Sequence, residues 1–107
     1  MLADELRKIQ EKFKINEEYL NKCIKLIDRD LIEFANEHKE TILKYNFYAG
    51  DIILYKKEDV LPGDTGTVRV PASYFYALQK HYEKEGITVM WAYTDEALNN
   101  GKITFSW

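Results

Sequence analysis

Two short segments near the C-terminus place the tightest limits on what this chain can fold into. In both, large apolar side chains stand at every second position: Ile87, Val89, Trp91 and Tyr93, then Ile103, Phe105 and Trp107. A period of two puts such side chains on one face of a β-strand. We therefore expect two strands whose apolar faces line the same core, with Thr88, Thr104 and Ser106 pointing outward.

Two further strands are predicted upstream of these segments. Gly50-Asp51 opens one apolar run, from Ile52 to Lys56, and a second run extends from Thr67 to Val70. The polar segment 57–66 between them contains Pro62-Gly63, a turn signal. We expect a long loop there.

A helix is predicted between the second and third strands. Pro71 suits a first helical turn, and Gly86 suits the position just after a last turn, so the helix should span 71–85. Asn100-Gly101 is a tight-turn dipeptide and should join the last two strands.

Residues 1–45 carry one apolar stripe at spacings of three or four, which is typical of amphipathic helices. Its members are Leu2, Leu6, Ile9, Phe13, Leu20, Ile24, Ile27, Leu31, Phe34, His38, Ile42 and Tyr45. Asn16 is a good N-cap with Glu17 and Glu18 in the first turn, which favours a break near 14–16. The stripe alone leaves one helix or two open. An unbroken helix over 2–45 would be about 66 Å long, so we favour a hairpin of two helices.

The C-terminal half resembles small SH3-like β-barrels of the KOW type, in which a Gly-Asp strand start precedes a Gly-x-x-Gly-Thr-Val turn and a Val-x-Trp strand. The matching residues are Gly50, Asp51, Leu54, Gly63, Gly66, Thr67, Val68, Val89 and Trp91. The resemblance implies a binding module for protein or nucleic acid. The predicted helix stands where such barrels have a short loop, so an open ββαββ sheet is the alternative to a closed barrel.

The predicted fold class is therefore α+β. A helical segment, residues 1–46, would pack as a hairpin on a small β-rich unit, residues 47–107. That unit would be a four-stranded antiparallel SH3-like or ββαββ arrangement with the inserted helix 71–85.

Composition narrows the range of partners and compartments. The net charge is −3 and both signs are spread along the chain, so no basic field favours nucleic acid. Cys23 is the only cysteine, which indicates a reducing, cytoplasmic setting, and its place beside the stripe predicts a buried thiol. The N-terminus has no apolar signal region, and no apolar run could span a membrane.

No grouping of residues predicts catalysis, a cofactor or a metal. The segment Pro62–Gly66 lacks the Lys-Ser/Thr pair of a phosphate-binding loop. His38 and His81 are the only histidines, and we expect His38 to be hydrogen-bonded at the edge of the core. The loop acids Asp51, Asp59, Asp64 and Asp95 lack the order of a calcium loop. We expect no enzyme.

Eight tyrosines and two tryptophans exceed what one small core needs, and both residue types favour binding hot spots. We therefore predict a non-catalytic protein-binding module. Its patch would carry an aromatic platform with an acidic rim, suited to a partner with a basic surface: Tyr55, Asp59, Asp64, Tyr74 and Tyr76.

Two other functions are left open by the sequence. One is an inhibitor of a host or defence enzyme, encoded by a phage or mobile element. The other is a nucleic-acid-binding SH3-like barrel with a local patch of Lys56, Lys57 and Arg69. The oligomeric state is open, and a dimer through the N-terminal helices is one arrangement that the stripe allows.

Overall fold

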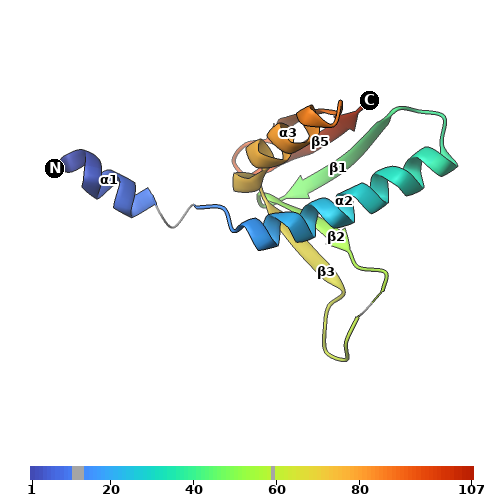
Figure 1. Ribbon diagram of the computed structural model, residues 1–107, viewed down its shortest axis with the longest axis horizontal. Helices are drawn as coiled ribbons and strands as arrows, with labels where there is room; N and C mark the ends of the chain where they lie inside the picture. Colours follow the sequence, from blue (N-terminus) through green and yellow to red (C-terminus); the bar gives the residue numbers. More distant parts are fainter. Residues whose placement is uncertain (11–13, 59) are drawn as a thin grey trace.

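The chain forms an α+β structure, and the computed structural model describes residues 1–10, 14–58 and 60–107. Within these residues the helices are α1 (Leu2–Gln10), α2 (Glu17–Glu37) and α3 (Phe75–Lys84), and a short 3₁₀ turn, η2 (Ala72–Tyr74), leads into α3. The strands are β1 (Ile42–Tyr48), β2 (Asp51–Tyr55), β3 (Thr67–Pro71), β4 (Thr88–Asp95) and β5 (Asn100–Ser106). Figure 1 shows the arrangement.

The five strands form one antiparallel sheet in the order β3-β2-β1-β5-β4. Helices α2 and α3 pack on one face of it, and the core lies between them and the sheet. The buried side chains of the strands stand at alternate positions: Phe47, Ile52, Leu54, Val68, Val70, Val89, Ile103 and Phe105. The helices contribute Leu20, Cys23, Ile24, Ile27, Leu31, Phe75, Leu78 and Tyr82.

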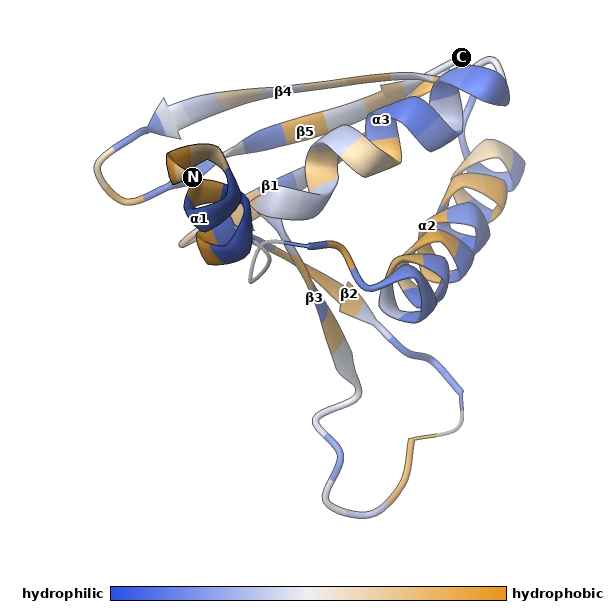
Figure 2. Cartoon of the chain, turned by 60° about the vertical axis from the view of Figure 1, so that its left-hand side comes forward, coloured by the Kyte–Doolittle hydropathy of each residue, from blue (hydrophilic) through white to orange (hydrophobic). Residues whose placement is uncertain are grey.

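The sheet splays at its centre. β1 pairs with β5 over Ile42–Phe47 but with β2 only at Phe47↔Ile52 and Tyr48↔Asp51. The tight turn between β1 and β2 has positive φ at Ala49 and Gly50. Beyond it, the β2–β3 hairpin runs away from β4 and β5, as Figure 2 shows. This divergence leaves room for α2 beside β2.

The prediction of four strands is corrected to five, and the sheet does not close into a barrel. Closure would need β3 to pair with β4, because all other neighbouring strands already pair. The inserted helix, predicted over 71–85, lies in that connection as η2 and α3. α3 packs its buried face on the sheet and so separates the two edges.

The prediction of a helical segment up to residue 46 is wrong, because the first strand of the sheet begins within it. α2 ends at Glu37, His38 is extended, and β1 begins at Ile42. His38 is exposed and stacks on Phe34, with ring centroids 4.4 Å apart, rather than lying hydrogen-bonded at the core edge. The domain boundary near 46/47 therefore falls inside β1.

The predicted helical hairpin is also wrong as a packed unit. The break at Asn16 is confirmed, because the Asn16 side chain accepts a hydrogen bond from the Tyr19 N–H at 3.1 Å and begins α2. However, all residues of α1 are exposed, including its apolar stripe of Leu2, Leu6 and Ile9. Figure 1 shows α1 standing clear of the body. Phe13, which the stripe also includes, lies outside the described residues.

The alternation near the C-terminus is confirmed in its main feature. Val89, Ile103 and Phe105 are buried on the helix-covered face, while Thr104 and Ser106 lie on the other. Trp107 follows β5 and contacts Phe34 edge-on, with 41% of its surface exposed. Among the described residues, no helix has both the length and the apolar character that crossing a membrane requires.

Candidate functional site

The structure does not bring together the four predicted patch residues that it describes, Tyr55, Asp64, Tyr74 and Tyr76. β3 pairs with β2 from Thr67↔Tyr55 at one end to Pro71↔Asp51 at the other. The loop after β2 lies beyond the first end, and α3 lies beyond the second (Figure 1). Asp64 belongs to that loop, Tyr74 to η2 and Tyr76 to α3. The predicted patch requires the loop and the start of the helix to be neighbours, but the whole of strand β3 lies between them. Asp59 lies outside the described residues.

Two of these residues serve the fold locally. Tyr74 is half-buried, its hydroxyl accepts a hydrogen bond from the Asn16 N–H at 3.1 Å, and its ring meets Tyr19 edge-on. Asp64 binds the Lys56 ammonium at 2.9 Å and accepts the Gly66 N–H. The hydrogen bond from Lys56, followed by that from Gly66, lowers the pKa of Asp64.

The other two predicted tyrosines are exposed on different elements. Tyr55 ends β2, and 63% of its surface is accessible. Tyr76 lies in the first turn of α3 with 59% accessible, and the Lys80 ammonium lies 4.9 Å from its ring centroid. Tyr76 therefore belongs to the surface around α3 and β4, which the sequence did not single out.

β4 is an edge strand whose outer backbone groups can be assigned residue by residue. The Thr104 and Ser106 hydroxyls donate to the Met90 and Thr88 carbonyls, which therefore face β5. Antiparallel pairing alternates the direction of these groups along a strand. The N–H and C=O groups of Val89, Trp91 and Tyr93 consequently point away from the sheet.

Only one of these outward groups has a partner from α3 in the described part of the chain. The Gln79 side-chain amide donates to the Val89 carbonyl at 2.8 Å. In the described part of the chain, the outward N–H and C=O groups of Trp91 and Tyr93 make no backbone hydrogen bond. They thus present a row of donors and acceptors to a further strand.

A hollow of about 330 Å³ lies directly beside this edge. Tyr76 and Gln79 of α3 line one side, and Met90 and Trp91 of β4 line the other. Met90 is 64% exposed, and the Trp91 ring packs edge-on against the buried Phe75. We call these four residues, together with the outward backbone of Trp91 and Tyr93, the β4 edge site.

The opposite edge of the sheet is blocked. β3 has only five residues, and it ends in Pro71, which has no N–H to donate. The Tyr19 hydroxyl donates to the Arg69 carbonyl, and the charged Arg69 side chain is exposed. Prolines, charges and short length are the usual protection of edge strands. β4 has none of these between Thr88 and Thr94.

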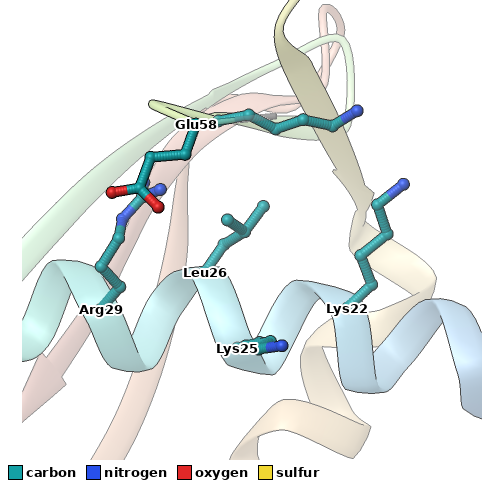
Figure 3. A pocket seen from close by; sticks show the side chains of 6 residues that line it. Lys22, Lys25, Leu26, Arg29 and Glu58 are labelled. Carbon is teal, nitrogen blue, oxygen red and sulfur yellow. The ribbon is translucent and has the colours of Figure 1, made fainter. Parts of the chain in front are cut away.

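A second hollow, of about 620 Å³, lies between α2 and the residues that follow β2. Its lining defines the cationic groove (Figure 3): Lys22, Lys25, Leu26, Arg29, Lys56 and Glu58. Three of the four cations come from one flank of α2, beside the helix face that enters the core. Sequence reasoning missed the groove because the groove forms only where residues 22–29 and residues 56–58 come together in the folded chain.

Metal ligands do not gather in the described part of the chain: no group of three His, Cys, Asp or Glu side chains there could hold a metal ion. Cys23 is fully buried as predicted, and burial raises the pKa of its thiol to about 11. Comparison with protein-family models, with curated proteins and with solved structures found no significant match.

Proposed function

We propose that this chain is a non-catalytic protein-binding module that takes up an extended apolar segment of another protein as a sixth strand along β4. The observation that carries the proposal is the β4 edge itself. The strand is eight residues long and carries no charge before Asp95. In the described part of the chain, the outward backbone N–H and C=O groups of Trp91 and Tyr93 make no hydrogen bond. Exposed edges of this kind bind other chains through main-chain hydrogen bonds.

The hollow beside the edge supplies side-chain specificity. In a strand added to β4, alternate side chains would point toward α3 and toward the open face of the sheet. One pointing toward α3 would enter the space between Tyr76 and Trp91, and the next would lie beside Met90. Aromatic and methionine side chains make favourable contacts with apolar groups of varied shape. The fitting segment is therefore uncharged and rich in β-branched or aromatic residues.

The proposal keeps one member of the predicted patch and changes the chemistry of the partner. Tyr76 lines the β4 edge site, whereas Tyr55, Asp64 and Tyr74 lie elsewhere. With the acidic rim separated from the aromatic residues, the reason to expect a basic partner surface is gone. An inhibitor that blocks an enzyme would act through the same kind of interface.

Selection of displayed random peptides on the intact protein tests the proposal. We expect the selected sequences to share apolar residues at alternate positions. Bound peptide should slow hydrogen exchange at the Trp91 and Tyr93 amides, which face outward. The Met90 and Ala92 amides face β5 and should change little, so they serve as internal controls.

A pair of variants at one residue separates backbone pairing from side-chain contact. Tyr93→Pro removes the outward N–H, which an edge strand tolerates, while Tyr93→Ala removes the ring and keeps the N–H. We expect Tyr93→Pro to bind at least about tenfold more weakly than Tyr93→Ala. Equal affinity of the two folded variants, or unchanged exchange at Trp91 and Tyr93 with peptide bound, would refute strand addition.

A further inference from the structure

The cationic groove gathers positive charge on a protein whose net charge is −3. Among the residues that the structure describes, no carboxylate lies within ion-pair distance of the Lys22 or Lys25 ammonium. Lys56 is paired with Asp64, and Arg29 with Asp30 at 3.1 Å. Two of the four cations at the groove are therefore available to an incoming anion without breaking an ion pair.

Arg29 is held in place before any ligand arrives. Its Nη2 donates both to the Tyr55 carbonyl at the end of β2 and to the Asp30 carboxylate. The Asp30 carboxylate is fixed in turn by the Tyr45 hydroxyl at 2.7 Å. The Arg29 Nε is buried and has no hydrogen-bond partner in the described part of the chain. A guanidinium fixed in this way loses little conformational entropy when it contacts an anion.

The charges are spaced along α2 in a way that suits several anionic groups rather than one. Lys22, Lys25 and Arg29 follow one another at three and four residues on one helix flank, spanning about 10 Å of helix axis. Alternate side chains of an extended peptide are about 7 Å apart. Two or three carboxylates of such a peptide could therefore meet these cations in sequence.

The rest of the lining distinguishes a peptide from a nucleic acid. Leu26 lies among the cations and offers an aliphatic surface, and Figure 3 shows it between Arg29 and Lys22. None of the described residues that line the groove is aromatic, whereas single-stranded nucleic acids bind by stacking on aromatic rings.

We propose that the cationic groove binds an acidic peptide segment of a partner protein, one with carboxylates on both sides of an aliphatic residue. The carboxylates pair with Lys22, Lys25 and Arg29, and the aliphatic side chain lies on Leu26. The groove and the β4 edge site belong to different elements, so this inference holds or fails independently of strand addition.

Fluorescence anisotropy tests this proposal. The probe is a short labelled peptide that carries glutamates on either side of one leucine. Two matched peptides replace the glutamates by glutamines or the leucine by serine, and a labelled oligothymidylate of the same length is the phosphate probe. The groove variant is Lys22→Glu with Lys25→Glu. Its control is Lys44→Glu with Lys102→Glu, on the open face of the sheet, which lowers the net charge equally.

We expect the acidic peptide to bind both the intact protein and the control variant, with affinities that differ by less than about threefold. The groove variant should bind it at least about tenfold more weakly. The glutamine peptide should not bind, the serine peptide should bind more weakly, and affinity should fall between about 50 and about 200 mM salt. Equal binding by the groove and control variants, no binding of the acidic peptide, or tighter binding of oligothymidylate would each overturn the proposal.

Discussion

Gly101 shows how one missing side chain fixes the packing of a neighbouring strand. It pairs with Phe47 of β1 and Tyr93 of β4 in the middle of the sheet. A Cβ at this position would lie 2.2 Å from the Ala92 carbonyl oxygen and 2.3 Å from the Phe47 ring. The glycine is therefore required by close packing and not by its backbone angles, since it has no positive φ.

Gly101→Ala should lower the free energy of unfolding by about 1–3 kcal/mol, because a backbone carbonyl and a buried ring must both move. Lys102→Ala, one residue along on the exposed face, should change it by less than about 0.5 kcal/mol. Urea denaturation of both variants measures the difference. Equal stability of the two would mean that the ring of Phe47 shifts freely.

The same residue explains one error of sequence-based prediction. Asn100-Gly101 looks like a hairpin turn, yet both residues belong to β5. The turn is formed by residues 96–99. In it, Asn99 has a φ of 54° and its N–H donates a hydrogen bond to the Glu96 carbonyl. Local turn chemistry could not reveal that Phe47, fifty-four residues upstream, needs the space above Gly101.

At the scale of elements, β1 is where two periodicities compete. Ile42 and Tyr45 continue the helical spacing of α2, while Leu43, Tyr45 and Phe47 alternate as a strand. The helix ends at Glu37, and pairing with β5 then fixes the alternation. The β-branched and aromatic content of 42–48 was the available signal. Between residues 50 and 93 the strands and the helix followed from the sequence, because turn signals and alternation agree there.

α2 allows a matched test of which apolar residues hold the helix to the sheet. Leu31 is 8% exposed, and its neighbour Ile32 is 64% exposed. Leu31→Ala should destabilise the protein by about 2–5 kcal/mol. Ile32→Ala, on the solvent side of the same turn, should cost less than about 0.5 kcal/mol. Thermal unfolding gives both values, and similar losses would show that a partner or second copy covers Ile32 in solution.

For the whole molecule, the decisive feature is the order in which strands pair. Sequence patterns identified four of the five strands, but which strands stand at the edges depends on β1 pairing with β5. The β4 edge site and the cationic groove both arise from that order, since it separates α3 from the 56–66 loop and brings α2 beside β2. Neither surface is encoded by one continuous stretch, so residue patterns alone could not locate it.

Two buried proton donors, Cys23 and Tyr82, and the partly buried Tyr45 make the stability of the whole fold sensitive to pH in the alkaline range. Burial raises the pKa of the Cys23 thiol to about 11. Burial also raises the pKa values of Tyr45 and Tyr82. The second largest cause is a hydrogen bond to a carboxylate, from Tyr45 to Asp30 and from Tyr82 to Asp28. A group whose pKa is higher in the folded state contributes stability below its unfolded pKa and loses it as the pH rises.

The free energy of unfolding should therefore hold steady up to about pH 8.5, where an unfolded cysteine begins to ionise, and fall from there to about pH 11. Tyrosines extend the fall above about pH 10, where they ionise in the unfolded chain. Cys23→Ala should flatten the first part of the curve and Tyr82→Phe the second. Urea denaturation across this range measures each curve against the intact protein. Parallel curves for all three proteins would show that these protons are not coupled to folding and that the decline comes from the surface lysines.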